Sequence, residues 1–274
     1  MRRLIGSRPL FVAVMSLLAL VYAFPLLWMA WSSFKTNREI FTSPLSLPAT
    51  FDFSTWGEAW RVGHLGRYAL NSTIVTSAAV LIILATAALA AFAFSRFQFP
   101  GRGLLLGVFG LGLLMPLQSY FIAQNSLFEL LDLKDTRLAL IIPYAGMGLP
   151  LAVYLLKVYL DSLPRELFEA ARVDGSGDAR MFTSLVLPLL RPGLATVAIF
   201  SALNAWNEFL LALLYITNDD LKTIPTGLLA FSSRYVTDYQ LLFSALTIVT
   251  LPMVAVYVMF HRQIVAGVVE GSLK

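Results

Sequence analysis

Six long apolar stretches constrain what this chain can fold into. A helix that crosses the hydrocarbon core of a bilayer needs about 20 mostly apolar residues. Stretches of this kind occupy residues 10–34, 68–95, 103–124, 137–157, 192–217 and 239–261. The mean hydropathy of +0.76 and the charged fraction of 13% are far from those of soluble domains. We therefore predict an all-α membrane protein with six transmembrane helices in a single domain, residues 1–274.

The basic residues predict which side of the membrane each loop faces. Loops on the cytoplasmic side of a membrane are enriched in Lys and Arg. A cytoplasmic amino terminus places most of the basic residues inside, among them Arg2, Arg3, Arg96 and Arg165. Both termini and the loop at residues 162–191 are then cytoplasmic. The first apolar stretch is too long for a signal-peptide core and has no cleavage pattern, so we expect it to be retained as a membrane span.

Several kinds of site are missing from the sequence. With no cysteine, the chain has no disulfide and no thiolate metal site. It also has no Walker A loop, no glycine-rich phosphate cradle and no metal-ligand cluster, so we expect no catalytic residue, no metal and no cofactor. Any ATP hydrolysis must come from another chain. The net charge of +4 follows from the cytoplasmic bias and does not indicate nucleic-acid binding.

The loop at residues 162–191 is a polar island between two apolar stretches. Pro164 is a typical helix-start residue, and residues 165–174 are predicted to form one short helix. Gly175 is expected to end that helix, because glycine adopts the left-handed cap conformation most easily. A second short helix at residues 178–187 is predicted to run into Pro188, and Pro192 is expected to open the fifth span.

The predicted helix at residues 165–174 has a patterned surface. Glu169 is spaced to form surface ion pairs with Arg165 and Arg172. One side of the helix is expected to carry Leu167, Ala170, Ala171 and Asp174. A small rigid helix joined to two spans can pass a push from a soluble partner into the membrane. The plain alternative is a solvated loop that only connects two spans.

The same loop resembles the EAA loop of permease subunits from binding-protein-dependent ABC importers. The family pattern is Glu-Ala-Ala, three residues, Gly, nine residues, an aliphatic residue, one residue and Leu-Pro. Every spacing is kept here, at Glu169, Ala170, Ala171, Gly175, Leu185, Leu187 and Pro188. Leu185 stands where the family more often has isoleucine, and this exchange keeps the bulk of the side chain.

Two further segments resemble the carbohydrate-uptake branch of that family. The turn after the second span reads Arg-Phe-Gln-Phe-Pro-Gly-Arg over residues 96–102, like the turn common in sugar permeases. Residues 205–209 read Ala-Trp-Asn-Glu-Phe, which looks like the run typical of the shorter, maltose-type second permease. The resemblance covers nearly the whole chain and is strongest over residues 165–192.

The resemblance implies a type I ABC importer permease fold and a set of partners. Those partners are an ABC ATPase dimer that binds ATP and Mg, a second and different permease, an extracytoplasmic solute-binding protein, a carbohydrate and membrane lipid. The helix at residues 165–174 would be the coupling helix that seats on the ATPase. The resemblance assigns the coupling role to Arg165, Glu169, Ala170, Ala171, Asp174, Gly175, Leu187 and Pro188.

Polar residues within the spans are candidates for the translocation path. Glu208 is the one acid in the six stretches, and ionisable residues inside a membrane are costly and often functional. The proposed path residues are Asn204, Trp206, Asn207 and Glu208 in the fifth span and Gln118 and Tyr120 in the third. Two alternatives remain: Glu208 lies at the outer interface or pairs with a partner subunit, and the third-span residues hydrogen-bond between helices.

Other segments admit two interpretations each. Phe51, Phe53, Trp56 and Trp60 in the first external loop either anchor the chain at the lipid headgroups or contact a docking protein. The fourth span contains Pro143, Gly146, Gly148 and Pro150, so we expect a kinked or broken helix that serves a gate or packing. The tail at residues 261–274 either reaches the ATPase or frays.

Two other classes of protein compete with an ABC permease. An ion-coupled secondary transporter acting without an ATPase would commonly show several embedded ionisable residues and an internal repeat. This chain has one embedded acid and no evident repeat between its halves. A membrane scaffold would explain the hydropathy but not the spacing of the loop motif. Co-isolation of an ATPase would distinguish the first class from the others.

Overall fold

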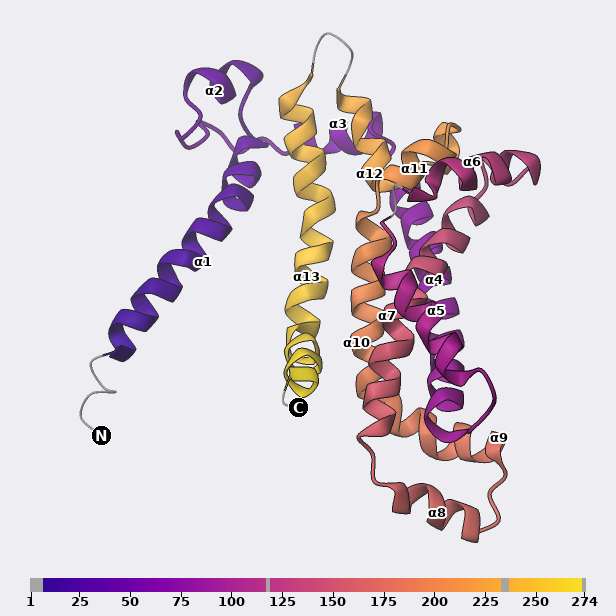
Figure 1. Cartoon of the computed structure of the whole chain (residues 1–274). Coiled ribbons are helices and arrows are strands. Elements are labelled where there is room, and N and C mark those ends of the chain that lie inside the picture. The colour runs from indigo at the N-terminus through magenta and orange to yellow at the C-terminus, as the bar shows by residue number, and fades with distance from the viewer. Residues whose placement is uncertain (1–6, 117–118, 233–236, 273–274) are drawn as a thin grey trace. The chain divides into compact units, whose positions relative to one another are not determined.

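The computed structural model describes residues 7–116, 119–232 and 237–272, which are mainly helical (Figure 1). Within these ranges the only β pairing is one isolated bridge between Ser232 and Thr237. Five described helical runs are long and apolar enough to cross a membrane: Pro9–Ser32, Leu65–Arg96, Leu138–Asp161, Asp178–Asn207 and Tyr239–Met259. The predicted all-α membrane fold is confirmed, and the third predicted span is shorter than the others.

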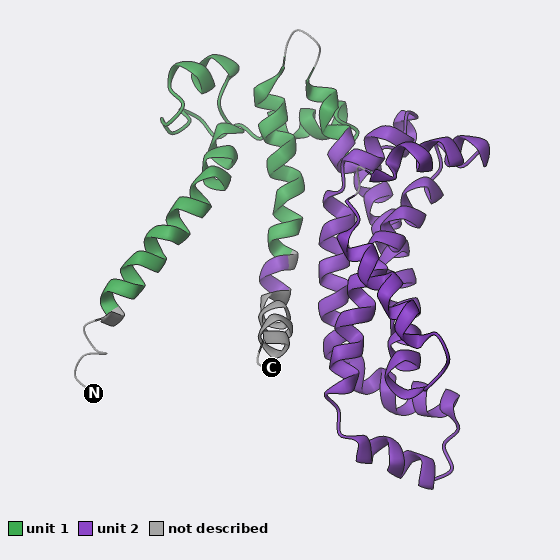
Figure 2. Cartoon of the chain, viewed as in Figure 1, with its two compact units in different colours: residues 1–66, 227–255 green, residues 67–226, 256–274 purple. Residues whose placement is uncertain are grey.

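The chain divides into two compact units (Figure 2). Unit 1 comprises Met1–Gly66 and Gly227–Ala255, and unit 2 comprises Arg67–Thr226 and Val256–Lys274. The main helices of unit 1 are α1 (Ser7–Ser32), α2 (Asn37–Thr42), α3 (Ser54–Val62) and the first half of α13 (Tyr239–Ser272). Between the units, the boundaries fall within α4 (Leu65–Arg96), α12 (Ile224–Gly227) and α13.

In unit 1, a buried lysine organises the segment that follows α1. The Lys35 side chain is fully buried, and its Nζ donates to the backbone oxygens of Ser43 at 2.9 Å and Pro44 at 3.0 Å. The Phe34 ring stacks on Trp56 with centroids 5.4 Å apart. Its edge contacts with Phe51 and Phe53 complete an aromatic cluster in which both of these rings stay more than half exposed.

Unit 2 is a helical bundle built on α4, α5 (Arg102–Leu114), α7 (Leu138–Asp161) and α10 (Leu187–Asn207). Small side chains allow its helices to approach closely, since Ala87, Ala88 and Ala91 of α4 are fully buried in the main core cluster. Figure 1 shows α8 (Arg165–Val173) and α9 (Asp178–Met181) at one end of the bundle. The opposite end carries α6 (Phe121–Leu130) and α11 (Leu210–Tyr215).

The third apolar stretch does not form one long helix. Helix α5 ends at Leu114, Met115 is extended, and α6 begins only at Phe121. The cause is Pro116, because a proline disfavours the helical conformation of the residue before it. The predicted span at residues 103–124 is therefore a 13-residue helix followed by part of a second helix.

The fifth span is also placed differently from the prediction. Helix α9 passes through a π-helical turn at Phe182–Val186 directly into α10, so one helical run extends from Asp178 to Asn207. Pro188 lies in the first turn of α10 instead of ending a helix, and Pro192 lies inside α10. The wider π turn shifts the carbonyls with which the Pro188 ring would collide, which explains the uninterrupted run.

Helix α7 is likewise continuous from Leu138 to Asp161, although it contains Pro143 and Pro150. The expectation of a broken helix here is wrong. Neighbouring helices and local adjustments satisfy backbone groups freed by proline, so membrane helices tolerate it.

Asp135 fastens the loop before α7 to the segment after α11. Its Oδ1 accepts from the backbone N–H groups of Thr217 at 2.6 Å and Asn218 at 2.7 Å. Its Oδ2 accepts from the Thr217 hydroxyl at 2.5 Å. These hydrogen bonds, led by that of the hydroxyl, hold the pKa of Asp135 below its ordinary value.

This lowered pKa predicts an acid-sensitive contribution to stability. A carboxylate with a depressed pKa stabilises the fold above the pKa of the unfolded chain, about 3.9, and the contribution disappears as the pH falls through the lower folded value. Asp135→Asn should therefore destabilise the protein by about 1 kcal/mol at pH 7 and by progressively less toward pH 2. Thermal unfolding in detergent across this range measures the difference.

Asp132 provides the matched control for this substitution. It lies in the same loop, and its carboxylate makes no hydrogen bond to any described residue. Asp132→Asn should change the unfolding temperature at pH 7 by less than Asp135→Asn does. Equal profiles for Asp135→Asn and the wild type would contradict the assigned role of Asp135.

Candidate functional site

Helix α8 has the predicted bounds and a defined end. It runs from Arg165 to Val173 after Pro164, and Gly175 adopts the left-handed conformation with φ of 77°. The Ser176 N–H donates to the Ala171 oxygen at 2.9 Å, and the Gly175 N–H donates to the Arg172 oxygen at 3.0 Å. This pair of bonds is a Schellman motif, which requires a residue that tolerates positive φ. Gly175 therefore fixes where the helix stops.

The structure shows which side of α8 is buried. Phe168 is the buried residue of the helix, and Ala171 packs beside it against the core cluster. Leu167, Glu169, Ala170 and Asp174 are exposed, and Val173 is 87% exposed. Among the described residues, Glu169 forms neither predicted ion pair. The outward surface of α8 thus combines a free carboxylate with exposed apolar side chains.

The remaining motif positions lie where the loop returns to the bundle. Leu187 is half-buried and packs against the core cluster, whereas Pro188 is exposed. Arg165 is exposed at the start of α8.

One contact that the sequence did not predict joins α8 to the bundle. The guanidinium carbon of Arg96, the last residue of α4, lies 3.3 Å from the centroid of the Phe168 ring. Arg96 Nη2 also donates to the Leu160 oxygen, in the last turn of α7, at 2.8 Å. The sequence draws attention to Arg96, because this residue opens the turn that resembles the sugar permeases. Nothing in the sequence, however, pairs Arg96 with Phe168.

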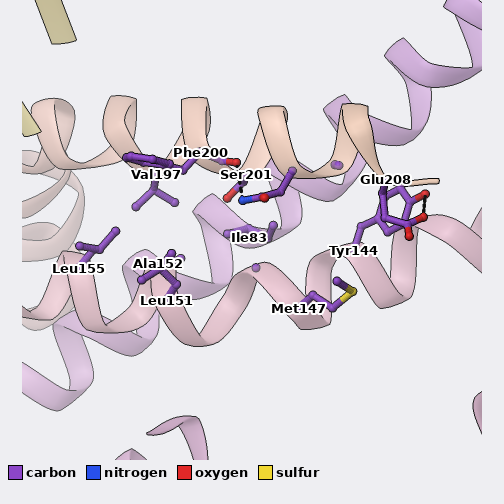
Figure 3. Close-up of a pocket in the computed structure, with 13 residues that line it drawn as sticks. Ile83, Tyr144, Met147, Leu151, Ala152, Leu155, Val197, Phe200, Ser201 and Glu208 are labelled. Atoms are coloured by element: carbon purple, nitrogen blue, oxygen red, sulfur yellow. Dashed lines mark hydrogen bonds between the residues drawn. The ribbon is translucent and has the colours of Figure 1, made fainter. Parts of the chain in front are cut away.

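A cavity of about 320 Å³ lies within unit 2 between α4, α7 and α10 (Figure 3). Most of its wall is apolar, formed mainly by Ile83, Met147, Leu151, Leu155, Val197 and Phe200. Its polar groups are Tyr144, Ser201, Asn204 and Glu208. Three of these come from α10 and its carboxyl end at spacings of three and four residues, which places them on one helix face.

Glu208 is held by three groups of its own chain at the end of α10. It is extended and separates α10 from α11. Its carboxylate accepts from the Tyr144 hydroxyl at 2.8 Å, the Leu211 N–H at 2.9 Å and the Ala212 N–H at 3.2 Å. Figure 3 shows Tyr144 and Glu208 side by side at one end of the cavity. The acid thus caps α11 and ties it to α7.

The other predicted path residues are distributed unevenly. Asn204 lines the cavity, and its side-chain amide donates to the Phe200 oxygen of its own helix at 2.9 Å. Trp206, Asn207 and Tyr120 are absent from the cavity lining. Gln118 lies outside the described residues. Tyr144 and Ser201 were not predicted, although Ser201 lies at helical spacing from Asn204.

The chemistry available at this site is hydrogen bonding without a metal. The described residues contain no group of three or more His, Asp or Glu side chains that could hold a metal ion. Hydroxyl, amide and carboxylate groups beside apolar walls suit a solute that carries both hydroxyl groups and apolar ring faces.

Comparisons with known proteins find curated relatives and solved structures that are similar to this chain over nearly its whole length. The chain is 38% identical to the diacetylchitobiose uptake system permease protein NgcG of Streptomyces coelicolor over 96% of this chain and 87% of that protein. It is 33% identical to the trehalose/maltose transport system permease protein MalG of Thermococcus litoralis over 100% and 99%, respectively. The fold matches a chain of a bacterial ABC transporter that imports alginate, with a TM-score of 0.82, 19% identity and coverage of 95% and 96%.

The match to a family model extends over almost the whole sequence. The model described as "Binding-protein-dependent transport system inner membrane component" aligns with residues 5–269. This range includes α8, its Schellman motif and all residues that line the cavity. The chain belongs to the family of inner membrane components of binding-protein-dependent transport systems.

Proposed function

We propose that this chain is the permease subunit of an ATP-driven carbohydrate importer and forms half of its translocation path. Its family membership supports a transport role, and the names of the relatives NgcG and MalG support a carbohydrate as the solute. The partners would be an ABC ATPase dimer that holds ATP and Mg, a second permease and an extracytoplasmic binding protein.

The exposed surface of α8 is the observation that carries the coupling proposal. Glu169 and Ala170 are adjacent, Val173 follows them by one helical turn, and all three side chains are exposed. A small helix with a carboxylate beside apolar side chains suits a cleft on a soluble partner. In this proposal the ATPase presents that cleft, Glu169 is the polar contact, and Gly175 sets the direction in which the loop leaves the helix.

The cavity supports a path through unit 2. Asn204 and Glu208 would hydrogen-bond the solute together with Ser201 and Tyr144, while the apolar walls accommodate ring faces. Four further residues are proposed as part of the path on the basis of the sequence alone: Trp206, Asn207, Tyr120 and Gln118. Ligand-driven states must differ in their contact energies for such a path to open on alternate sides.

Purification and reconstitution test the proposed function. Affinity purification of the tagged chain should co-isolate an ATPase, and proteoliposomes containing the complex should take up diacetylchitobiose or maltose only with ATP on the side of α8. Accumulation driven by an ion gradient through the lone chain would instead establish a secondary transporter. Failure to co-isolate any ATPase would contradict the coupling proposal.

The proposed orientation, with α8 and both termini in the cytoplasm, has a direct test. The chain has no cysteine, so single cysteines report cleanly on exposure. Val173→Cys in α8 should react with a membrane-impermeant maleimide only in inside-out vesicles. Leu45→Cys, at a position 70% exposed in the segment between α2 and α3, should react only in intact spheroplasts. The opposite pattern would place the coupling surface outside the cell.

A further inference from the structure

We propose that the contact between Arg96 and Phe168 transmits movement of α8 to the bundle, which makes Arg96 a positioning residue for transport. The inference rests on the proposed coupling role of α8. It concerns a step inside this chain, between the exposed surface of α8 and the helices that surround the cavity.

The contact joins three helices through one side chain. Arg96 ends α4, its guanidinium lies over the ring of Phe168 in α8, and its Nη2 reaches the Leu160 oxygen in the last turn of α7. Both α4 and α7 contribute residues to the cavity wall. A displacement of the Phe168 ring would therefore act through Arg96 on both α4 and α7, two of the helices that line the cavity.

Burial makes this contact stronger than a surface contact of the same kind. Phe168 is 6% exposed and Leu160 is fully buried. Arg96 Nε is also buried, and it has no hydrogen-bond partner among the described residues. A cation over an aromatic face is held more tightly when water is excluded. Arg96 itself is half-buried, so moving Phe168 away would expose the ring and the covered part of the guanidinium.

The chemistry of the contact suits an element that moves. Among the described residues, Arg96 forms no salt bridge, so no carboxylate holds it in a fixed two-point geometry. A planar guanidinium can slide over a ring face while it keeps a hydrogen bond to a helix terminus. Lysine lacks the planar group, and leucine at position 168 would fill space but offer no ring face.

A reporter in the cavity measures transmission directly. Met147 is 41% exposed and lines the cavity, so Met147→Cys in the cysteine-free chain gives one maleimide-reactive site there. In the purified complex with its ATPase, Mg-ATP plus vanadate should change the labelling rate of this cysteine. ATP hydrolysis and the amount of co-purified ATPase are measured in the same samples.

The test variants carry this reporter and separate transmission from docking. With Phe168→Leu or Arg96→Lys, the nucleotide-induced change in labelling should shrink about fivefold or more, because the half-buried cation–π contact is lost or weakened. Hydrolysis and ATPase co-purification should stay within about twofold of the parent, since the exposed surface of α8 is untouched. Phe168→Tyr keeps the ring face and should keep most of the response.

Two controls complete the design. Arg102→Lys changes an arginine six residues away whose side chain makes no hydrogen bond, ion pair or ring contact with any described residue, and it should behave as the parent. The double variant Arg96→Lys with Phe168→Leu should be no worse than the more affected single variant, because both remove one interaction.

Three outcomes would overturn the proposal in distinguishable ways. A full labelling response in Phe168→Leu and Arg96→Lys would show that the contact transmits nothing, while the proposed function stands. Loss of ATPase co-purification in both variants would assign the pair to docking. If the parent complex contains no ATPase, or if nucleotide does not change the labelling rate, the proposed coupling role of α8 is wrong. The role inferred for Arg96 and Phe168 is then wrong as well.

Discussion

Reversing the charge at Glu169 is expected to abolish uptake while leaving the protein in the membrane. The Glu169 carboxylate is exposed and makes no ion pair with any described residue, so Glu169→Lys removes no internal contact. Its effect on folding should stay within about 0.5 kcal/mol. At the proposed ATPase interface, however, the lost charge pair costs about 2–5 kcal/mol, which reduces uptake by about thirtyfold or more.

The control for Glu169→Lys is the same reversal elsewhere on the surface. Glu129 is exposed on α6 and has one loose ion pair with Lys134 at 4.0 Å. Glu129→Lys should leave ATP-dependent uptake close to the wild-type rate. Membrane content by immunoblot and uptake of labelled solute are the measurements.

Gly175→Asp should give the same loss of uptake by a different route. At φ of 77° a side chain is strained by about 1 kcal/mol, and the new carboxylate changes the charge beside the outward surface of α8. The Schellman motif that directs the loop is weakened as a result. Normal uptake in both Glu169→Lys and Gly175→Asp would show that α8 does not couple transport to ATP.

Glu208→Ala should combine a stability defect with a loss of transport. The substitution leaves the Tyr144 hydroxyl and the N–H groups of Leu211 and Ala212 without their acceptor. A buried polar group left unsatisfied costs about 1–3 kcal/mol, so the total should be on the order of 3 kcal/mol. Thermal unfolding in detergent and the uptake rate in vesicles measure the two effects.

Two variants show whether Glu208 also contacts the solute. Glu208→Gln keeps one acceptor oxygen and should recover part of the stability. Among the described residues, the Asn204 amide bonds only to its own helix, so Asn204→Ala should change stability little while it changes solute preference. Unchanged transport rate and solute preference in Asn204→Ala would exclude Asn204 from the path. The same result in Glu208→Ala would leave that acid with a structural role alone.

The parts of the fold that the sequence could predict depend on short-range patterns. The start of helix α8 was predicted correctly and its end to within one residue, because Pro164 and Gly175 act on their own backbone. The apolar stretches predicted membrane helices because length and hydropathy are enough to recognise them. The left-handed end of the helix was likewise a local property of glycine.

The parts that could not be predicted depend on distant residues or on competing local effects. The acceptor role of Glu208 needs Tyr144, which lies 64 positions away in the sequence, and the buried side of α8 needs Arg96 from the end of α4. Periodicity grouped Leu167 with Ala171 on one side of α8 but could not show which residues are buried, and the structure exposes Leu167 while Ala171 packs against the core cluster. The break at Pro116 was not predicted, because residues 103–124 are apolar enough to suggest one uninterrupted span. The predicted stop at Pro188 was wrong, because the π turn accommodates this proline inside a continuous helical run.

The π turn at Phe182–Val186 also sets the rotation of α9 about the helix axis relative to α10. Such a turn holds one residue more than an α-helical turn, and each residue of an α-helix contributes about 100° of rotation. Deleting one residue there would preserve a continuous helix yet swing α9 and the loop bearing α8 around its axis by roughly that angle. The direction in which Glu169 points thus depends on the one extra residue of the π turn, which lies more than ten positions further along the chain.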